Sequence, residues 1–386
     1  MKKITLLINS LTSGGAEKVL SLLITELNRQ HYEVTLISIE KESFYTVPDG
    51  VERLYLSSLK TDDSAIKKLL YLPLLAWRLK RYIKESGVTL IQSHMYRANY
   101  INILAKIFGA KHTVQVVEVT NINSFKLPLL TKKINLKLIE WLYPHIDLIV
   151  FLAERMKLDF FQHLPLDKPF AVINNPYDIE KIERLCGEEV DNFSFEDEKR
   201  YLVTVGRLDR QKNQQGIIEI LNELDSSVEL LVVGDGVLKE DLERKIDELK
   251  LKGRVHLLGN QRNPFKYIRH SDIFILNSRE EGFPNVLVEA MLCGTAVIST
   301  DCISGPREIL APKSDILFQL KEGYEEAENG LLTPVDDGES LVQAINRLLS
   351  DPLLKETYEV KAKEDAKNYS LEKIIEKYKD VLECVE

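Results

Sequence analysis

The stretch that decides the fold is Glu280-Glu281-Gly282-Phe283-Pro284-Asn285-Val286-Leu287-Val288-Glu289-Ala290. It follows a strand-like apolar run, and Gly282 and Pro284 mark a turn into a helix, because proline suits the first helical turn. We expect the backbone N–H groups at 283–287 to project from a helix N-terminus, which favours an anion. With Glu281 and Glu289 on either side, the stretch suits a ligand that carries both phosphate and hydroxyl groups. A surface helix with an incidental turn is the alternative.

Two further connections between a strand and a helix support this interpretation. Residues 201–205 form a predicted strand that ends at Gly206, and the following loop contains Arg207 and Lys212. Arginine binds phosphate as a fork and lysine as a point charge. Near the N-terminus, a predicted strand at 4–8 leads to a glycine pair that opens a helix, although many turns use such a pair.

Together these segments resemble the retaining glycosyltransferases of family four. The motifs that carry the resemblance are Thr12–Glu17, Gly206–Asn213, Gly234-Asp235-Gly236, Gly259-Asn260, Glu281–Glu289 and Ser304–Glu308. The resemblance covers nearly the whole chain and is strongest over 201–310. Within the family, the chain is most similar to bacterial N-acetylgalactosaminyltransferases that extend undecaprenyl-diphosphate-linked glycans. This likeness depends on residues 72–78, 234–239 and 263–267.

The resemblance implies an α/β chain with the GT-B fold, in which two Rossmann-like parallel-sheet domains face a central cleft. We expect an acceptor- and membrane-facing domain at 1–177 and a nucleotide-sugar-binding domain at 178–386. The last helix, at about 370–386, is expected to pack back toward the first domain. The alternation of predicted strands and helices along the 386 residues independently favours parallel sheets covered by helices.

The resemblance also assigns roles to individual residues. It implies a UDP-sugar donor, with Glu281 on hydroxyls of the donor sugar and Glu289 on the ribose. The other expected donor-binding residues are Gly14, Gly15, Gly206, Gly259, Asn260, Gly282, Phe283, Pro284, Asn285, Val286 and Leu287. Retention of the anomeric configuration is implied by the resemblance alone, and we name no protein nucleophile.

Sugar transfer leaves negative charge on the departing diphosphate, and fixed donors must stabilise it. We therefore expect Arg207, Lys212 and Glu281 to be the catalytic residues. No Asp-x-Asp motif follows a strand, so we expect catalysis without a metal ion or other cofactor. A glycosidase pair of glutamates is disfavoured, because a helix over 282–289 would separate the two backbones by about 12 Å, whereas such carboxyl groups lie about 5–9.5 Å apart.

One position departs from the family pattern. Many members have a histidine at the end of the fifth strand of the first domain, where this chain has Val119. Glu118, Thr120 and His94 are possible acceptor-side residues, since ligands bind at the carboxyl ends of strands in open sheets. A structural role is an equal alternative for His94. We expect His112 and His145 to be structural.

The charge of the chain is divided between its two halves. Residues 1–175 contain 23 basic and 16 acidic residues, whereas residues 176–386 contain 28 and 44. The basic half includes two segments, at 67–84 and 125–141, in which cations alternate with leucines and aromatic residues. We expect both segments to face an anionic membrane surface, which such helices can bind, the first of them through Lys67, Lys68, Trp77, Arg78, Lys80 and Arg81. The alternative is a pair of ordinary helices that cover a sheet.

Composition and sequence patterns limit the expected cellular location of the protein and the kinds of partner it can have. No apolar span of 18 residues is present, Met1-Lys2-Lys3 leads directly into a predicted strand, and the four cysteines show no Cys-x-x-Cys spacing. We therefore expect a cytoplasmic protein with reduced thiols, bound peripherally to the inner face of the membrane. The acidic whole-chain balance and the lack of a recognition module argue against a nucleic-acid partner.

Several alternatives remain open from the sequence. The acceptor could belong to lipopolysaccharide or capsule synthesis instead of a lipid-linked glycan for protein glycosylation. A GT-B nucleotide-sugar epimerase or phosphorylase, or a non-catalytic sugar-nucleotide binder, would share the same motifs, and release of an epimer or binding without turnover would identify them. A nicotinamide oxidoreductase is disfavoured, because Gly234-Asp235-Gly236 lacks the third glycine of the dinucleotide fingerprint.

Overall fold

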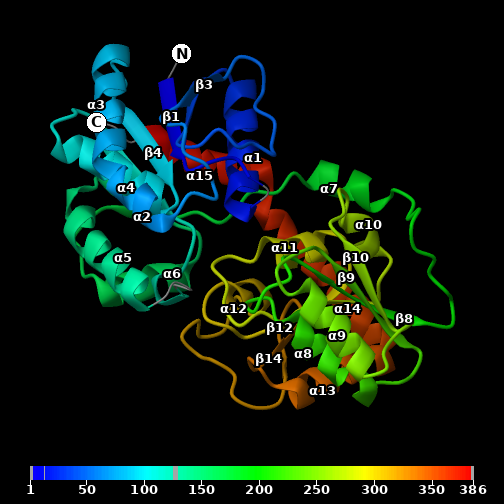
Figure 1. Cartoon of the computed structure of the whole chain (residues 1–386). Coiled ribbons are helices and arrows are strands. Elements are labelled where there is room, and N and C mark those ends of the chain that lie inside the picture. Colours follow the sequence, from blue (N-terminus) through cyan, green and yellow to red (C-terminus); the bar gives the residue numbers. More distant parts are fainter. Residues whose placement is uncertain (1–2, 13, 125–128, 384–386) are drawn as a thin grey trace. The chain divides into compact units, whose positions relative to one another are not determined.

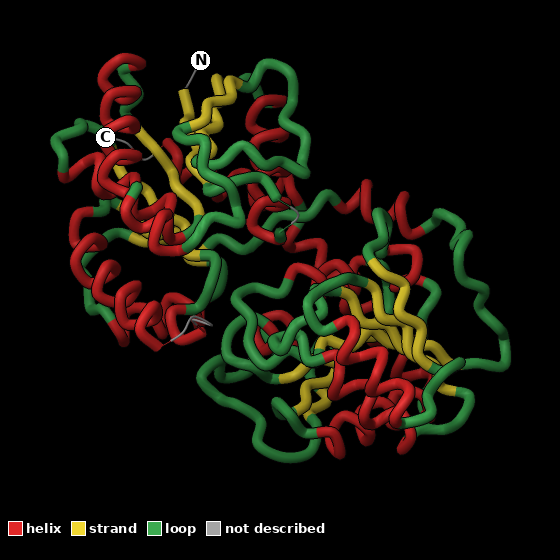
Figure 2. The backbone as a smooth tube through the Cα atoms, in the orientation of Figure 1, coloured by secondary structure: helices red, strands yellow, loops and turns green. Residues whose placement is uncertain are grey.

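The computed structural model describes residues 3–12, 14–124 and 129–383. The chain divides into two compact units, Met1–Tyr177 with Leu371–Glu386, and Asp178–Ser370. The C-terminal segment from Leu371 thus groups with the first unit, whereas the sequence placed it in the second domain and expected its helix to pack back. Each unit has a sheet of mostly parallel strands at its centre with helices around it (Figures 1 and 2).

The first unit contains a seven-stranded parallel sheet in the order β3-β2-β1-β4-β5-β6-β7. Its strands are β1 (Lys3–Ile8), β2 (Glu33–Ser38), β3 (Glu52–Tyr55), β4 (Leu90–His94), β5 (Thr113–Glu118), β6 (Leu148–Phe151) and β7 (Phe170–Val172). β1, β2, β4, β5 and β6 are buried along most of their length, as expected of strands covered on both faces.

The helices of this unit are α1 (Gly15–Arg29), α2 (Ala65–Leu70), α3 (Leu72–Ser86), α4 (Tyr96–Ile107), α5 (Leu129–Leu142), α6 (Glu154–His163) and α15 (Leu371–Glu383), with short 3₁₀ turns at Ile122–Ser124 and Tyr143–His145. α1 packs against α15, and α3 packs against α4. The side-chain amide of Gln115 on β5 also donates to the carbonyl of Val381 on α15 at 2.7 Å. The last helix is therefore part of the first unit's core.

The second unit contains a seven-stranded sheet in the order β10-β9-β8-β11-β12-β14-β13. Its strands are β8 (Arg200–Val205), β9 (Val228–Val233), β10 (Val255–Gly259), β11 (Ile273–Leu276), β12 (Ala296–Thr300), β13 (Glu325–Glu326) and β14 (Leu331–Thr333). All neighbouring strands run parallel except β13 and β14. These two sheets confirm the predicted α/β class with two Rossmann-like units.

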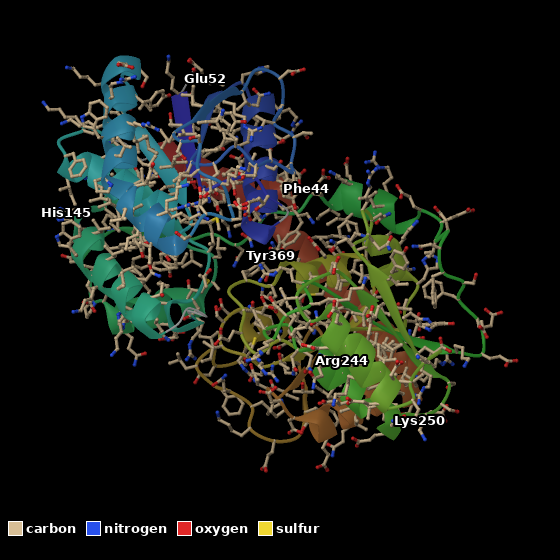
Figure 3. The ribbon with its side chains drawn as sticks, in the orientation of Figure 1. Phe44, Glu52, His145, Arg244, Lys250 and Tyr369 are labelled. Carbon is tan, nitrogen blue, oxygen red and sulfur yellow. The ribbon has the colours of Figure 1, made fainter. Side chains whose placement is uncertain are left out.

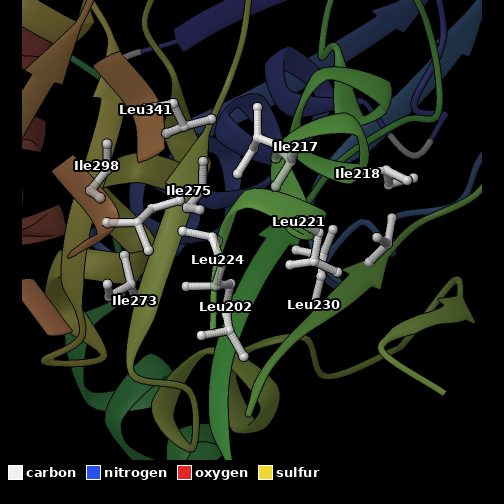
Figure 4. Packing of buried hydrophobic residues seen from close by; sticks show 14 of the residues in the cluster. Leu202, Ile217, Ile218, Leu221, Leu224, Leu230, Ile273, Ile275, Ile298 and Leu341 are labelled. Carbon is white, nitrogen blue, oxygen red and sulfur yellow. The ribbon is translucent and has the colours of Figure 1, made fainter. Parts of the chain in front are cut away.

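The helices of the second unit are α7 (Ile179–Cys186), α8 (Gln214–Ile220), α9 (Lys239–Glu248), α10 (Phe265–Arg269), α11 (Asn285–Leu292), α12 (Pro306–Leu310), α13 (Gly338–Ser350) and α14 (Pro352–Ala366), with 3₁₀ turns at Leu221–Glu223 and Lys367–Tyr369. Leucine and isoleucine side chains from β8, β9, β11, β12, α8 and α13 form one of its buried clusters (Figure 4). This packing holds the strands whose carboxyl ends carry the candidate site.

Both sheets reverse their strand order at a defined point. In the second unit the reversal lies between β8 and β11, and in the first unit between β1 and β4. Ligands of open α/β sheets bind outside the carboxyl ends of the strands at such a point. The connections that follow β8 and β11 are the two loops singled out in the sequence.

Candidate active site

An ion pair joins the two loops at the switch point of the second unit. The ammonium nitrogen of Lys212 lies 2.6 Å from Oε1 of Glu281. Both groups are mostly enclosed, since the side chain of Lys212 is 17% exposed and that of Glu281 is 8% exposed. The structure therefore brings together two of the three expected catalytic residues, which are 69 residues apart in the chain.

Local hydrogen bonds shape the loop that carries Lys212. One carboxylate oxygen of Asp209 accepts from the backbone N–H groups of Gln211 and Lys212, both at 3.0 Å. Asn213 then takes a left-handed conformation with φ 49° before α8 begins. The alkyl chain of Lys212 passes close to Gly206, where an added Cβ would lie 3.4 Å from its Cε. The loop thus directs Lys212 back over the end of β8.

Arg279 and Asp336 fasten this loop to the loop after β11. The backbone N–H of Arg279 donates to Gln211 and its guanidinium donates to the carbonyl of Arg210, each at 2.8 Å. The guanidinium also binds Asp336 at 2.8 Å, and the Asn213 amide donates to the same carboxylate at 3.2 Å. No local pattern in the sequence indicates that Arg279 and Asp336 meet.

Arg207, the third expected catalytic residue, points toward solvent. Its side chain is 73% exposed and lies 3.2 Å from a carboxylate oxygen of Asp209. In the described part of the chain no ion pair joins it to Glu281 or Lys212, so the structure does not connect all three residues directly. An exposed guanidinium at the end of β8 is free to close on an anion that occupies the site.

The start of α11 corrects one expectation. The helix begins at Asn285, with Pro284 as its N-cap, so Phe283 precedes the helix. The N–H of Leu287 donates to the carbonyl of Pro284 at 3.0 Å. The N–H of Leu287 is therefore paired within this turn instead of projecting from it, and Phe283 lies outside the helix.

Phe283 is buried and has a structural contact. Its ring packs edge-on against Tyr369, with ring centroids 5.5 Å apart. Val286 is half-buried, whereas Leu287 and Glu289 are buried. Glu289 is 6% exposed, so this second carboxyl group of the site is buried.

Ser304 and Gly305 support the turn that carries Glu281. The hydroxyl of Ser304, whose φ is 73°, donates to the carbonyl of Gly282 at 2.9 Å. A Cβ on Gly305 would lie 2.4 Å from Cδ of Pro284, so only glycine fits against this turn. Both residues belong to the motif Ser304–Glu308 that carries part of the family resemblance, but the sequence alone assigns no role to either of them. Strained backbone of this kind persists where the surroundings over-determine it.

Three glycines line the ends of adjacent strands. Gly206, Gly234 and Gly259 follow or end β8, β9 and β10, and the N–H of Gly234 donates to the carbonyl of Gly259 at 2.8 Å. A Cβ on Gly234 would lie only 1.9 Å from the carbonyl oxygen of Gly206. Bare backbone therefore borders the site beside the ion pair. Asn260, the next expected donor residue, is exposed.

The switch point of the first unit contains the glycine pair and a buried histidine. Gly14 is the N-cap of α1 and Gly15 its first residue. His94 ends β4 at 2% exposure, and its Nε2 atom has no hydrogen-bond partner. Burial lowers the pKa of His94 to about 3, so the ring is neutral at physiological pH. Met95 follows with a φ of 76°.

Glu118 lies inside the first unit instead of at its surface. It is 3% exposed and accepts hydrogen bonds from the hydroxyl of Tyr143 and, at 3.2 Å, from the amide of Asn99. Burial raises the pKa of Glu118 to about 7, against the opposing effect of these donors. The neighbouring Thr120 is half-buried, and its carbonyl lies 3.4 Å from the hydroxyl of Tyr96. A ligand could contact the carboxyl group of Glu118 only if these neighbouring side chains moved.

Glu118→Gln should change how stability depends on pH. Between about pH 4.5 and 7 the folded state retains a proton that the unfolded chain releases, so stability from this group falls as pH rises. The difference in unfolding free energy between wild type and variant should shift by about 3 kcal/mol across that window. Urea unfolding at several pH values measures it. The exposed Asp62→Asn is the control, and parallel pH profiles for wild type and Glu118→Gln would contradict the assignment.

Two other histidines are placed as follows. Nε2 of His112 lies 2.9 Å from the side-chain oxygen of Asn102 inside the first unit, so it has a structural contact. His145 is exposed (Figure 3). Among the described residues, no group of three or more His, Cys, Asp or Glu side chains is arranged to hold a metal ion.

The structure corrects part of the expected membrane-facing set. The ammonium of Lys68 lies 2.6 Å from the carbonyl of Thr61 and 3.6 Å from Glu40, and that of Lys80 lies 2.5 Å from the carbonyl of Phe108. Both ammonium groups therefore bind other segments of the protein. Arg78 also donates to the carbonyl of Leu56 at 2.6 Å, although its residue is exposed overall. Lys67, Trp77 and Arg81 are exposed on α2 and α3.

Of the second basic segment, Phe125, Lys126 and Leu127 lie outside the described residues. Trp141, near the end of α5, is 57% exposed. None of the helices in the described part of the chain is both long enough and apolar enough to cross a bilayer.

Comparison with known proteins agrees with this arrangement. Residues 13–181 match the model of Glycosyltransferase Family 4, and residues 188–369 match that of Glycosyl transferases group 1. The chain is 33% identical over 97% of both lengths to the N-acetylgalactosamine-N,N'-diacetylbacillosaminyl-diphospho-undecaprenol 4-alpha-N-acetylgalactosaminyltransferase of Campylobacter jejuni. It is 24% identical, over 99% of this chain and the whole relative, to the amylovoran biosynthesis glycosyltransferase AmsD of Erwinia amylovora.

The fold is also similar to that of solved structures. The crystal structure of Anabaena Alr3699/HepE with UDP and glucose aligns with a TM-score of 0.75 over the whole of both chains, at 20% identity. The resemblance inferred from the motifs is thus confirmed by relatives along the full length. The chain belongs to the family-four glycosyltransferases and is a glycosyltransferase with the GT-B fold.

Proposed function

We propose that the protein transfers a sugar, N-acetylgalactosamine or another N-acetylhexosamine or hexose, from a UDP-sugar to a lipid-diphosphate-linked glycan, with retention of configuration. The observation that carries this proposal is the Lys212–Glu281 pair beside the glycine-lined ends of β8, β9 and β10. A cation and a buried carboxylate held together match a ligand with a diphosphate next to a sugar. The C. jejuni relative is named for transfer of that sugar to such a lipid-linked acceptor.

The proposed bond changes are those of the retaining course that the family resemblance implies. The anomeric carbon–oxygen bond of the donor breaks, and the diphosphate leaves with the electron pair. The acceptor oxygen bonds to the anomeric carbon on the same face, and its proton passes to the departing diphosphate. In this proposal Lys212 and Arg207 stabilise the charge on the diphosphate. Glu281 and Glu289 accept hydrogen bonds from sugar and ribose hydroxyls.

The ion pair fits these roles. Lys212 neutralises the enclosed carboxylate of Glu281, which would be costly to bury alone. A bound donor supplies both groups with new partners, the diphosphate for Lys212 and hydroxyls for Glu281. The two cations provide the positive charge at this position, so we propose that no divalent ion is needed.

We further propose that α2 and the outer face of α3 contact an anionic membrane at its cytoplasmic face. α2 has no buried residue, and its Ile66 and Leu70 are each 73% exposed. On α3, Leu74 is 42% and Trp77 is 52% exposed, whereas Leu75 and Leu79 are buried. Apolar side chains flanked by Lys67 and Arg81 suit the interface of an anionic bilayer.

Replacing Ile66, Leu70, Leu74 and Trp77 together by serine should weaken binding to phosphatidylglycerol-containing vesicles by about tenfold or more, because the variant loses its insertable apolar surface. Cosedimentation with vesicles measures the effect. Serine at Leu353 and Val360, which are 77% and 67% exposed on α14 of the other unit, is the matched control. Equal binding of the quadruple variant and wild type would remove the membrane proposal without affecting the sugar-transfer proposal.

The function itself is tested with a panel of donors and acceptors. We expect purified protein, a UDP-sugar and a short-chain diphosphate-linked glycan to give a product heavier by one sugar residue in mass spectrometry. Transfer only to a polysaccharide-type acceptor would support the alternative, a role in lipopolysaccharide or capsule synthesis. Release of an epimerised UDP-sugar without any acceptor would instead indicate an epimerase.

A further inference from the structure

Two thiols meet between the first helix of the second unit and the helix of the candidate site. Cys186 is the last residue of α7, and Cys293 directly follows α11. Their sulfur atoms lie 3.1 Å apart, although the residues are 107 positions apart in the chain. Both are free thiols, 8% and 2% exposed. Neither the family motifs nor the proposed sugar transfer gives these residues a task.

Two cations lie beside this pair. Lys363 of α14 binds Glu183 of α7 at 2.9 Å, and Arg269 donates to the carbonyl of Gly294 at 3.1 Å. A Cβ on Gly294, next to Cys293, would lie 3.5 Å from the Arg269 guanidinium and 3.6 Å from the Lys363 chain. Nearby positive charge favours the thiolate, which is the reactive form of cysteine.

The two cations favour the ionised form of one of the two thiols, which lowers its pKa. The pKa of Cys186 is lowered, first by the hydrogen bond with Cys293 and further by Lys363 and Arg269. The pKa of Cys293 is raised, first by the same hydrogen bond and then by burial. The pair thus consists of a thiol that ionises more easily and a second thiol within reach of it.

The packing of α7 offers access to this pair. α7 has eight residues, and only Ile182 and Cys186 are buried. A short helix held by few buried contacts opens locally more easily than the core around it. Cys186, at the end of this helix, can therefore meet a small oxidant while the sheet remains folded.

We propose that Cys186 and Cys293 form a reversible disulfide that ties α7 to α11 under oxidising conditions. With hydrogen peroxide, the Cys186 thiolate attacks one peroxide oxygen, which forms a sulfenic acid and releases hydroxide. The sulfur of Cys293 then attacks that sulfur, the S–S bond forms, and the sulfenic-acid oxygen leaves as water once it has taken the Cys293 proton. Two thiols are oxidised to one disulfide while peroxide is reduced to two waters. A dithiol reductant reverses the step.

The disulfide would be attached at the end of α11, the helix that carries Glu289. The backbone N–H of Cys293 donates to the carbonyl of Glu289 at 3.0 Å, so the two residues lie one helical turn apart. A covalent bond at that turn fixes the end of α11 to α7. Because the bond closes a long loop, it restricts the unfolded chain and stabilises the second unit.

The test uses the full-length protein with Cys384, which lies outside the described residues, replaced by serine. After mild peroxide treatment of the folded protein, we expect a mass loss of about 2 Da and a peptide that links Cys186 to Cys293. The melting temperature should rise by about 5–15 °C and return after reduction.

Matched variants make the outcome decisive. Cys186→Ser and Cys293→Ser should each lose the linked peptide and the rise in melting temperature. Cys302→Ser should keep both, because Cys302 is a third buried thiol of the same unit outside this pair. Both thiols of the folded parent remaining free after peroxide, or a link that involves Cys302, would overturn the proposal. These readouts use no sugar donor, so they stand or fall independently of the proposed function.

Discussion

Glu281→Gln should lower kcat/KM for sugar transfer by about 10²–10³-fold, which is the range for loss of one preorganised charged or hydrogen-bonding group at a reacting centre. The amide keeps the shape of the side chain but removes the charge that faces Lys212 at 2.6 Å. Lys212→Met should cost a similar factor, because the diphosphate then leaves without the cation nearest to it. Steady-state kinetics with a saturating acceptor measure both losses.

The double variant separates a shared role from two independent ones. Because the two groups contact each other, their effects should not add, and the double variant should be much less impaired than the product of the single losses predicts. Arg207→Ala should also reduce kcat strongly. It should leave stability almost unchanged, because this side chain is 73% exposed.

Arg210→Ala is the matched control for these variants. Arg210 lies in the same loop and is exposed, and only its carbonyl takes part in the network through Arg279. Its side chain should therefore be dispensable. Wild-type rates for Glu281→Gln, Lys212→Met or Arg207→Ala would reject the assigned role of that residue. A loss in Arg210→Ala as large as theirs would show that the effects of Lys212→Met and Arg207→Ala reflect only a general loss of positive charge.

The sequence predicted those parts of the site that depend on local order along the chain. Glycine at a strand end, a cation a few residues later and a following helix can be recognised without tertiary information. Parallel strands then bring such loops to the same edge of a sheet, which is why Lys212 and Glu281 meet. The start of α11 was misplaced because proline is compatible with either the N-cap or the first helical turn.

Contacts between distant segments could not be read in the same way. Nothing near Asp336 indicates that Arg279 binds it, and nothing near Ser304 indicates that its hydroxyl reaches Gly282. Lys68 and Lys80 were expected to face lipid, but their direction depends on carbonyls of other segments. The strands β3, β7, β13 and β14 have two to four residues each, too few to give a clear alternating pattern.

Gly234→Ala should destabilise the second unit by about 3–5 kcal/mol, because steric overlap and backbone strain combine at this position. The added Cβ would lie 1.9 Å from the carbonyl oxygen of Gly206, and the φ of 141° is one that residues with a side chain rarely adopt. Neither group can move alone, since the N–H groups of Gly206 and Gly234 bond to neighbouring strand ends. Urea unfolding should show a lower midpoint.

The same substitution should also reduce donor use. Displacing Gly206 shifts the start of the loop that carries Arg207 and Lys212, so KM for the donor should rise in whatever fraction remains folded. Gly253→Ala separates strain from overlap. Gly253 has a φ of 88° but no atom within 4 Å of its added Cβ, so it should cost only about 1–2 kcal/mol and leave the donor KM unchanged. Equal destabilisation by the two alanines would mean that the strand ends move apart easily. The close packing of Gly234 against Gly206, which we infer beside the ion pair, would then be wrong.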